Sequence, residues 1–262
     1  MNILLIGDIV GRPGRRAVEG LLQDLQDRHR VDFTIVNAEN AAAGLGLTEK
    51  IAHQLLDAGV DCITSGNHIW AQKEAQDFLP RIPRLLRPAN YPPGAPGAGW
   101  GVYKSHTGQD VAVLNLLGRV FMDPLDCPFR GADAILAELP RVAAIVVDFH
   151  AEATSEKIAF GRYLDGRVTA VIGTHTHVQT ADETVFPGGT AFLCDVGMTG
   201  PTNSVIGVLP EVSVQRFVSG LPARFQVPSR GPCVLSAVVI ESDDKTGLAR
   251  SINRLQEHLN SE

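Results

Sequence analysis

Short apolar runs that end in a polar side chain alternate with amphipathic helical patterns along this chain. The runs are rich in valine and isoleucine, which is typical of buried strands. Five of them lead to a carboxylate, amide or imidazole, namely Asp8, Glu39, Asn67, His150 and His175. Because ligands gather outside the carboxyl ends of strands in sheets built from βα units, the pattern predicts an α/β fold with a polar site at one rim.

The expected elements follow one another without a composition shift that would mark a domain boundary, so we predict a single domain over residues 1–262. Strands are predicted at residues 2–6, 32–36, 61–64, 111–116, 143–148, 169–172, 190–194 and 234–240. Helices are predicted at 15–29, 48–58 (with Thr48 as N-cap), 71–79, 133–138 and 153–163, and a short peripheral one within 243–262. Residues 80–101 are rich in proline and glycine, and we expect an irregular segment that offers a partner surface.

Charge and cysteine usage narrow the functional classes. The chain has 23 basic and 29 acidic residues, a formal net charge of −6, and no basic block, which argues against a long nucleic-acid track. The four cysteines form no C-x-x-C pair, which favours small buried side chains in a reducing compartment. The N-terminus does not match a signal peptide and no apolar run is long enough to cross a membrane, so we expect a cytoplasmic protein.

Two histidines, His175 and His177, follow a predicted strand within residues 168–178. On an extended backbone, side chains two residues apart lie on one face about 6–7 Å apart. That spacing is too wide for one ion but suits two ions roughly 3.5–4 Å apart. Alone, such a pair is more often simply part of a polar loop. Imidazoles combined with carboxylates favour manganese, iron or zinc over calcium.

The other candidates also have ordinary structural interpretations. Asp8 could cap a helix, Asn67 could be a turn residue, and His150 could be a buried histidine with satisfied hydrogen bonds. Glu39 is harder to explain in this way, since an acid that follows a buried strand must be exposed or paired. The joint occurrence of all of them at strand ends favours a site with two metal ions.

Three glycines within residues 7–14 invite comparison with a nucleotide-binding loop. Their spacing is G-x-x-x-G-x-x-G, which does not match the dinucleotide fingerprint, and no Walker lysine follows. Gly7 is better explained by a turn and Pro13 by the start of a helix. Arg12 remains a candidate contact for a substrate phosphate.

Five segments, in order along the chain, carry a resemblance to a known family. They are GDIVGRPG at residues 7–14, NAEN at 37–40, DFHAEATSEK at 148–157, GTHTHVQTAD at 173–182 and DVGMTG at 195–200. With these motifs the chain resembles the calcineurin-like metallophosphoesterases, and more narrowly their YmdB-like branch of bacterial phosphodiesterases. The resemblance implies a four-layer α/β/β/α sandwich, in which two mixed β-sheets are flanked by helices.

The resemblance also implies two divalent metal ions per chain, with iron or manganese preferred over zinc. The implied ligands are Glu39 as the bridge, Asp8, Asn40 and His177 for one ion, and Asn67, His150 and His175 for the other. His68 would not bind metal; it would project from the extended chain on the side opposite Asn67 and protonate the departing ribose oxygen. Thr199 lies in a loop that the resemblance assigns to the border of the site, so it is a second candidate substrate contact.

Two positions depart from the broad superfamily. Val10 stands where the usual Asp-x-His motif has histidine, and Glu39 stands where the bridging residue is usually aspartate. Asn40 can offer an amide oxygen in place of the missing imidazole, which makes that metal site harder. The YmdB-like branch has the same substitutions, so they favour that branch.

The function that the resemblance implies is metal-dependent hydrolysis of 2′,3′-cyclic nucleotides by a homo-oligomer. The alternatives are a phosphomonoesterase, a nuclease that acts on short RNA, and a regulatory protein that binds nucleotide or RNA and retains weak activity. Retention of every ligand type argues against the regulatory alternative.

Overall fold

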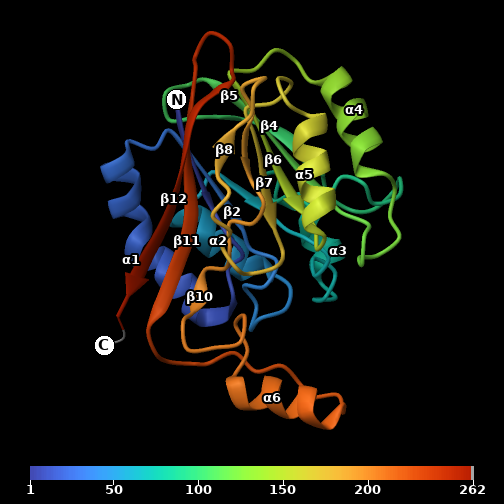
Figure 1. Ribbon diagram of the computed structural model, residues 1–262, viewed down its shortest axis with the longest axis vertical. Helices are drawn as coiled ribbons and strands as arrows, with labels where there is room; N and C mark the ends of the chain where they lie inside the picture. Colours follow the sequence, from blue (N-terminus) through green and yellow to red (C-terminus); the bar gives the residue numbers. More distant parts are fainter. Residues whose placement is uncertain (261–262) are drawn as a thin grey trace.

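The computed structural model describes residues 1–260 and contains two mixed β-sheets that pack face to face, with helices on both outer faces (Figure 1). The strands of the first sheet are β1 (Asn2–Ile6), β2 (Phe33–Asn37), β3 (Cys62–Thr64), β10 (Gly200–Pro201), β11 (Cys233–Ser242) and β12 (Ala249–Leu259). Those of the second sheet are β4 (Trp100–Lys104), β5 (Asp110–Leu117), β6 (Ala144–His150), β7 (Ala170–Thr174), β8 (Thr184–Val185) and β9 (Ala191–Leu193). The predicted four-layer sandwich is confirmed.

Apolar side chains fill the three interfaces between the four layers. Helices α1 (Gly11–His29) and α2 (Glu49–Asp57) pack on the first sheet, while α4 (Pro128–Glu138) and α5 (Thr154–Tyr163) pack on the second. Between the sheets, side chains such as Ile3 and Phe33 meet Val146 and Ile172. The alternation along each strand therefore sends one face to a helix and the other to the opposite sheet.

Three smaller elements lie outside these layers. The short helix α3 (Ala75–Phe78) and the 3₁₀ turn η1 (Leu79–Arg81) follow β3, and α6 (Pro210–Ser219) projects from the body of the molecule (Figure 1). Within residues 1–260, no helix is long and apolar enough to cross a membrane.

Parallel pairing aligns the strand ends that carry the predicted site. In the first sheet β1, β2 and β3 run parallel, and in the second β5, β6, β7 and β9 do. The carboxyl ends of each set therefore lie at one edge, and the loops that leave them form a common rim.

Several local predictions need correction. The helix expected within residues 243–262 is wrong, because residues 249–259 form β12, paired antiparallel with β11; residues 261 and 262 lie outside the described residues. Of the helix expected at 71–79 only a single turn forms. The segment 80–101 is largely irregular as predicted, but Leu85 and Leu86 are buried; Leu85 forms a bridge to Ile63 of β3, and Leu86 forms one to Ala98 within the segment. Helix α6 was not predicted.

Candidate metal centre

All seven predicted ligands lie at the rim formed by the strand ends. Asp8 follows β1, Glu39 and Asn40 follow β2, and Asn67 follows β3. His150 is the last residue of β6, and His175 and His177 follow β7. The structure therefore brings together side chains that are separated by up to 169 residues in the sequence (177 minus 8).

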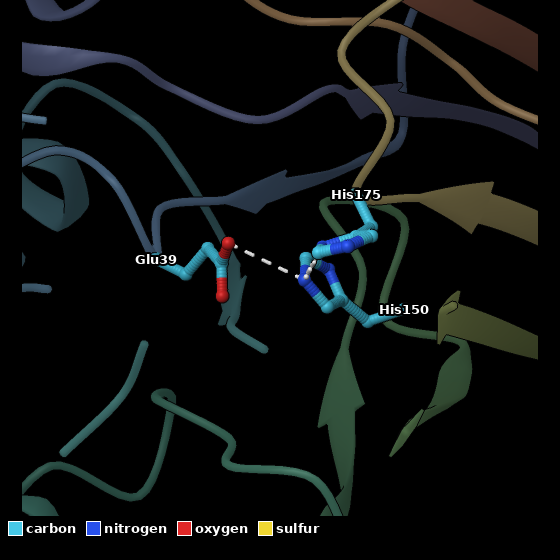
Figure 2. A group of neighbouring side chains, drawn as sticks. All are labelled: Glu39, His150 and His175. Carbon is cyan, nitrogen blue, oxygen red and sulfur yellow. Dashed lines mark hydrogen bonds and ion pairs between the residues drawn. The ribbon is translucent and has the colours of Figure 1, made fainter. Parts of the chain in front are cut away.

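One donor group surrounds the Nε2 atom of His150. His175 Nδ1 lies 3.0 Å from it, Asn67 Oδ1 3.1 Å and Glu39 Oε1 3.3 Å. In Figure 2 the two imidazoles lie against each other on one side and the Glu39 carboxylate points at them from the other. One ligand atom each from Glu39, His150 and His175 fall within 4.8 Å of one another, a spacing that can hold one metal ion.

The protonation of His150 is set by hydrogen bonds on the far side of its ring. Thr174 Oγ1 donates to Asp148 Oδ1 at 2.6 Å, so the same hydroxyl accepts a hydrogen bond from His150 Nδ1 at 2.9 Å. With one proton fixed on Nδ1, Nε2 is the nitrogen that faces Asn67, His175 and Glu39 and that a cation would bind. Fixing the tautomer in this way is typical of histidines that bind metal.

A second donor group contacts Glu39 through the same oxygen, Oε1. Asn40 Nδ2 is 3.0 Å from Glu39 Oε1 and 3.2 Å from His177 Nε2. In this orientation the nitrogen of the Asn40 amide faces Glu39 and His177. Rotating the amide by half a turn would bring its oxygen to face them instead. Within residues 1–260, no hydrogen-bond partner satisfies the buried Oδ1 of Asp8, and the nearest imidazole nitrogen, Nδ1 of His150, is 3.9 Å away.

These features fit divalent cations. A buried carboxylate oxygen without a hydrogen bond is costly, and a cation at that point would satisfy it. Around His150 Nε2 the facing atoms of Asn67 and Glu39 are acceptors, so this point favours a positive charge, either a proton on Nε2 or a cation that replaces it. The mixture of carboxylate, amide and imidazole donors suits manganese, iron or zinc.

The electrostatics of the centre favour a positive charge beside Glu39. Burial acts to raise the pKa of Glu39, but neighbouring imidazoles hold that pKa well below its ordinary value. Burial acts to lower the pKa of His150, yet the carboxylates of Glu39 and Asp8 raise it to about 9. Burial, helped by His150, lowers the pKa of His175 to about 3, so its lone pair is free. Burial raises the pKa of Asp8 to about 6.

His68 lies beside the centre without joining either donor group. Its Nδ1 is 2.8 Å from Asn40 Oδ1 and 3.3 Å from Glu39 Oε1, and its backbone N–H donates to Glu39 Oε2 at 3.1 Å. The expected extended backbone is wrong here, because residues 67–70 form a turn. His68 therefore contacts Asn40 and Glu39, whereas Asn67 contacts His150.

The extended geometry expected for His175 and His177 is also wrong. Both have positive φ, 100° and 67°, so the chain turns sharply at each. As a result His175 reaches His150, whereas His177 reaches Asn40, with its Nδ1 2.9 Å from Ile206 O. The two histidines still join different donor groups, as two metal sites would require, but a strained turn and not strand spacing separates them.

The two candidate substrate contacts differ in their surroundings. Arg12 is exposed at the start of α1, and its role stays a prediction. Thr199 needs correction: it is fully buried, and its hydroxyl exchanges hydrogen bonds with the backbone of Ser236 in β11. Its side chain therefore joins the loop to the first sheet and does not face a substrate.

Val10 stands where the superfamily has histidine. It is buried and lies close to Gly207, where an added Cβ would come within 2.7 Å of Val10 Cγ1.

Sequence reasoning missed three buried charged residues that support the ligands. Asp148 accepts hydrogen bonds from Asn37 and Thr64 of the first sheet and from Thr174 of the second. Lys157 and Asp195 form a buried ion pair, with Nζ 2.7 Å from Oδ2. The available signal was a charged residue inside or directly after an apolar run, which must find a partner when buried.

Comparison with known proteins agrees with the geometry of this rim. The family model described as "YmdB-like protein" matches residues 4–255. The chain belongs to this family.

Among curated proteins, the chain is 52% identical over 256 residues to the 2′,3′-cyclic-nucleotide 2′-phosphodiesterase of Bacillus subtilis, with 97% of this chain and 96% of the relative covered. It is 38% identical over 254 residues to a putative phosphatase/phosphodiesterase of Mycoplasma pneumoniae, covering 94% and 89%.

Two solved structures have nearly the same fold. A hypothetical protein from Thermus thermophilus superposes with a TM-score of 0.92 at 42% identity, covering 98% of this chain and 99% of that one. A structure titled as a novel phosphatase from Mycoplasma pneumoniae gives a TM-score of 0.92 at 35% identity, covering 99% and 94%. The relatives are thus hydrolases of phosphoric esters wherever their names state an activity.

Proposed function

We propose that this protein is a two-metal phosphodiesterase that opens 2′,3′-cyclic nucleotides. The observation that carries the proposal is the position of Glu39, which lies between the donor group at His150 Nε2 and the donor group at Asn40 and His177. The name and 52% identity of the Bacillus subtilis relative support the substrate class.

The proposed ligands are Glu39 as the bridge, Asn67, His150 and His175 for one ion, and Asp8, Asn40 and His177 for the other. When bound, two divalent cations would lower the pKa of a water molecule toward neutrality and neutralise the phosphate oxygens in the transition state. We propose iron or manganese as the native metals, with zinc as the alternative, because one donor group is rich in oxygen and the other in nitrogen.

His68 is the proposed general acid. Its Nδ1 faces Asn40 and Glu39, so Nε2, at the opposite side of the ring, points away from the donor groups. His68 has 36% of its side chain accessible, whereas Glu39 and His150 are buried and His175 is 19% accessible. In hydrolysis, water adds to phosphorus, one P–O bond to the ribose breaks, and the proton from His68 would go to the departing ribose oxygen.

Metal analysis combined with a substrate panel tests the proposal. We expect protein purified without added metal to hold about two transition-metal ions per chain and to open 2′,3′-cyclic mononucleotides with little release of free phosphate. Comparable phosphate release from nucleoside monophosphates would assign a phosphomonoesterase, and faster cleavage of short RNA would assign a nuclease. Nucleotide or RNA binding without metal-dependent turnover of bis-p-nitrophenyl phosphate would instead indicate a regulatory protein.

We also propose that the protein is a cytoplasmic homo-oligomer. The four cysteines are free, and Cys62, Cys194 and Cys233 are buried, which supports a reducing compartment. The segment at 80–101 is a poorer candidate for the subunit contact than α6, where Val214, Phe217 and Val218 are each more than half exposed. Replacing Phe217 and Val218 by serine should reduce the mass measured by light scattering; an unchanged mass would exclude α6 as the contact.

A further inference from the structure

The turn that carries His175 and His177 is held in a conformation that residues other than glycine rarely adopt. φ is 100° at His175 and 67° at His177, and Thr176 lies between them. Such backbone strain persists only where the surrounding structure determines it. A group that fixes Thr176 therefore helps to direct both imidazoles, together with the contacts of His175 Nε2 to Glu152 Oε2 at 3.1 Å and of His177 Nδ1 to Ile206 O at 2.9 Å.

Asp195, which follows β9, makes the hydrogen bonds that fix Thr176. Its Oδ2 accepts the backbone N–H of Thr176 at 2.9 Å and the Thr176 hydroxyl at 2.7 Å, and its Oδ1 accepts the N–H of Gly197 at 2.8 Å. The backbone of Asp195 adds a second attachment, since its carbonyl accepts from Thr180 N at 3.0 Å and its N–H donates to Thr180 Oγ1 at 2.9 Å. Asp195 thus joins β9 to the middle of the histidine turn through its carboxylate and to Thr180 through its backbone.

Lys157 of α5 supplies the charge that allows this carboxylate to be buried. Its Nζ donates to Asp195 Oδ2 at 2.7 Å, and both side chains are only 1% exposed. Its aliphatic stem lies against Gly173 of β7, where an added Cβ would come within 3.1 Å of Lys157 Cδ. A buried ion pair adds little net stability compared with apolar packing, so its value here lies in the geometry that it imposes.

We propose that the Lys157–Asp195 pair is a positioning device that aims His175 and His177 at the two metal sites without touching either ion. This inference rests on the proposed function, because it assigns a role toward the metals of that same site. Each histidine belongs to a different donor group, so disturbing the pair should weaken both sites together. A pair that only stabilises the core would leave metal affinity unchanged.

The test compares two threonine-to-valine variants that each lose one hydroxyl. Thr176→Val removes the hydroxyl that donates to Asp195, while the backbone N–H and the branched shape remain. Thr190→Val is the control: Thr190 is buried at the opposite end of β9, and its hydroxyl donates to Val168 O at 2.7 Å and accepts the Gly166 N–H at 3.0 Å, so this variant loses at least as much hydrogen bonding. Metal-free protein is titrated with Co²⁺, whose absorption spectrum reports ligand geometry, and thermal unfolding is measured without metal.

We expect both variants to unfold at a lower temperature than the parent, and only Thr176→Val to change metal binding. Its affinity for both Co²⁺ ions should fall about 10–100-fold, as is typical when a partner of a ligand is removed, and the spectrum should shift. Lys157→Met should act in the same direction, because it leaves Asp195 charged and unpaired.

Parental Co²⁺ affinity and spectrum in Thr176→Val would refute the inference, and so would an equal loss in Thr190→Val. If Lys157→Met does not fold, the threonine pair still decides. A parent protein that fails to bind two Co²⁺ ions would overturn the proposed function itself, and this inference with it.

Discussion

The two halves of the rim are built in different ways. The half contributed by the first sheet supplies oxygen donors, from Asp8, Glu39, Asn40 and Asn67, whereas the half contributed by the second sheet supplies imidazoles. None of the four oxygen-bearing residues has positive φ, while two of the three histidines do. Regular strand ends therefore suffice for the oxygen half, and the imidazole half needs a strained turn.

The difference follows from the chemistry of the donors. A carboxylate has two oxygens with several lone pairs and tolerates small rotations, whereas a neutral imidazole offers one lone pair in one direction. In the oxygen half, backbone N–H groups hold one oxygen of each carboxylate: His68 N donates to Glu39 Oε2 and His175 N to Asp8 Oδ2. Buried networks at Asp148 and Asp195 orient the imidazoles.

The largest expected effect comes from the residue that the two halves share. Glu39→Gln removes the bridging charge with little change of shape, so the affinity for both ions should fall. Loss of a residue that only hydrogen-bonds to a ligand costs up to roughly 100-fold in metal affinity, and loss of the bridging ligand should cost at least as much. Elemental analysis and Co²⁺ titration measure this loss. Full double occupancy in the variant would disprove the bridging role.

Glu156→Gln is the control for this change. Glu156 is also buried, but its carboxylate accepts only the backbone N–H groups of Arg119 and Val120, at 3.1 Å. Its replacement should lower stability and leave two metal ions bound.

The next effect separates proton transfer from metal binding within the oxygen half. His68→Ala should keep both ions and lose roughly 10²-fold in turnover of substrates with an alkoxide leaving group. The loss should shrink on a p-nitrophenyl ester, because the phenolate leaves without a proton. Asn67→Ala, which removes an amide oxygen 3.1 Å from His150 Nε2, should instead reduce metal affinity and turnover together.

Two outcomes would change this assignment. An equal loss by His68→Ala on both substrates would point to positioning of the phosphate and not to general acid catalysis. Loss of metal from His68→Ala would show that His68 is a metal ligand. The first sheet would then contribute an imidazole as well as oxygen donors.

A smaller effect tests whether the imidazole half depends on its supporting network. Thr174→Val and Thr64→Val each remove one hydrogen bond to Asp148, so each should lower the free energy of unfolding by about 1 kcal/mol. Only Thr174 also accepts from His150 Nδ1, so only Thr174→Val should weaken metal binding, by about 10-fold. Chemical denaturation and Co²⁺ titration separate the two quantities. Equal affinities in both variants would show that His150 needs no such orientation.

The same contrast explains what could be predicted from the sequence. The strands and the polar residues at their ends were predictable, because periodicity and order along the chain determine which residues share a sheet edge. The detailed geometry of His175 and His177 was not, since the turn depends on Asp195 and on Lys157 of another element, contacts that no local pattern contains.

Two further errors have similar causes. Residues 249–259 are polar and alternate weakly, so they resembled a peripheral helix; pairing along β11 makes them a strand. The hydroxyl of Thr199 was expected to face the site, but Ser236, 37 residues later, satisfies it. Tertiary pairing overrides local preference in the first case and decides the direction of a side chain in the second.

The smallest expected effect concerns Arg12, at the edge of the oxygen half. The residue before it, Gly11, donates its N–H to Asn40 O at 2.9 Å. Arg12 therefore lies in the first turn of α1, close to the proposed metal site, and its side chain is exposed. Because an exposed charge acts through water, Arg12→Ala should raise KM for a cyclic nucleotide about twofold to fivefold with kcat unchanged. The difference should fade at high salt, where such interactions are screened. Arg16→Ala, one helical turn further along α1, is the control, and an equal rise in KM for both variants would mean that the general charge of the helix, and not Arg12, attracts the substrate.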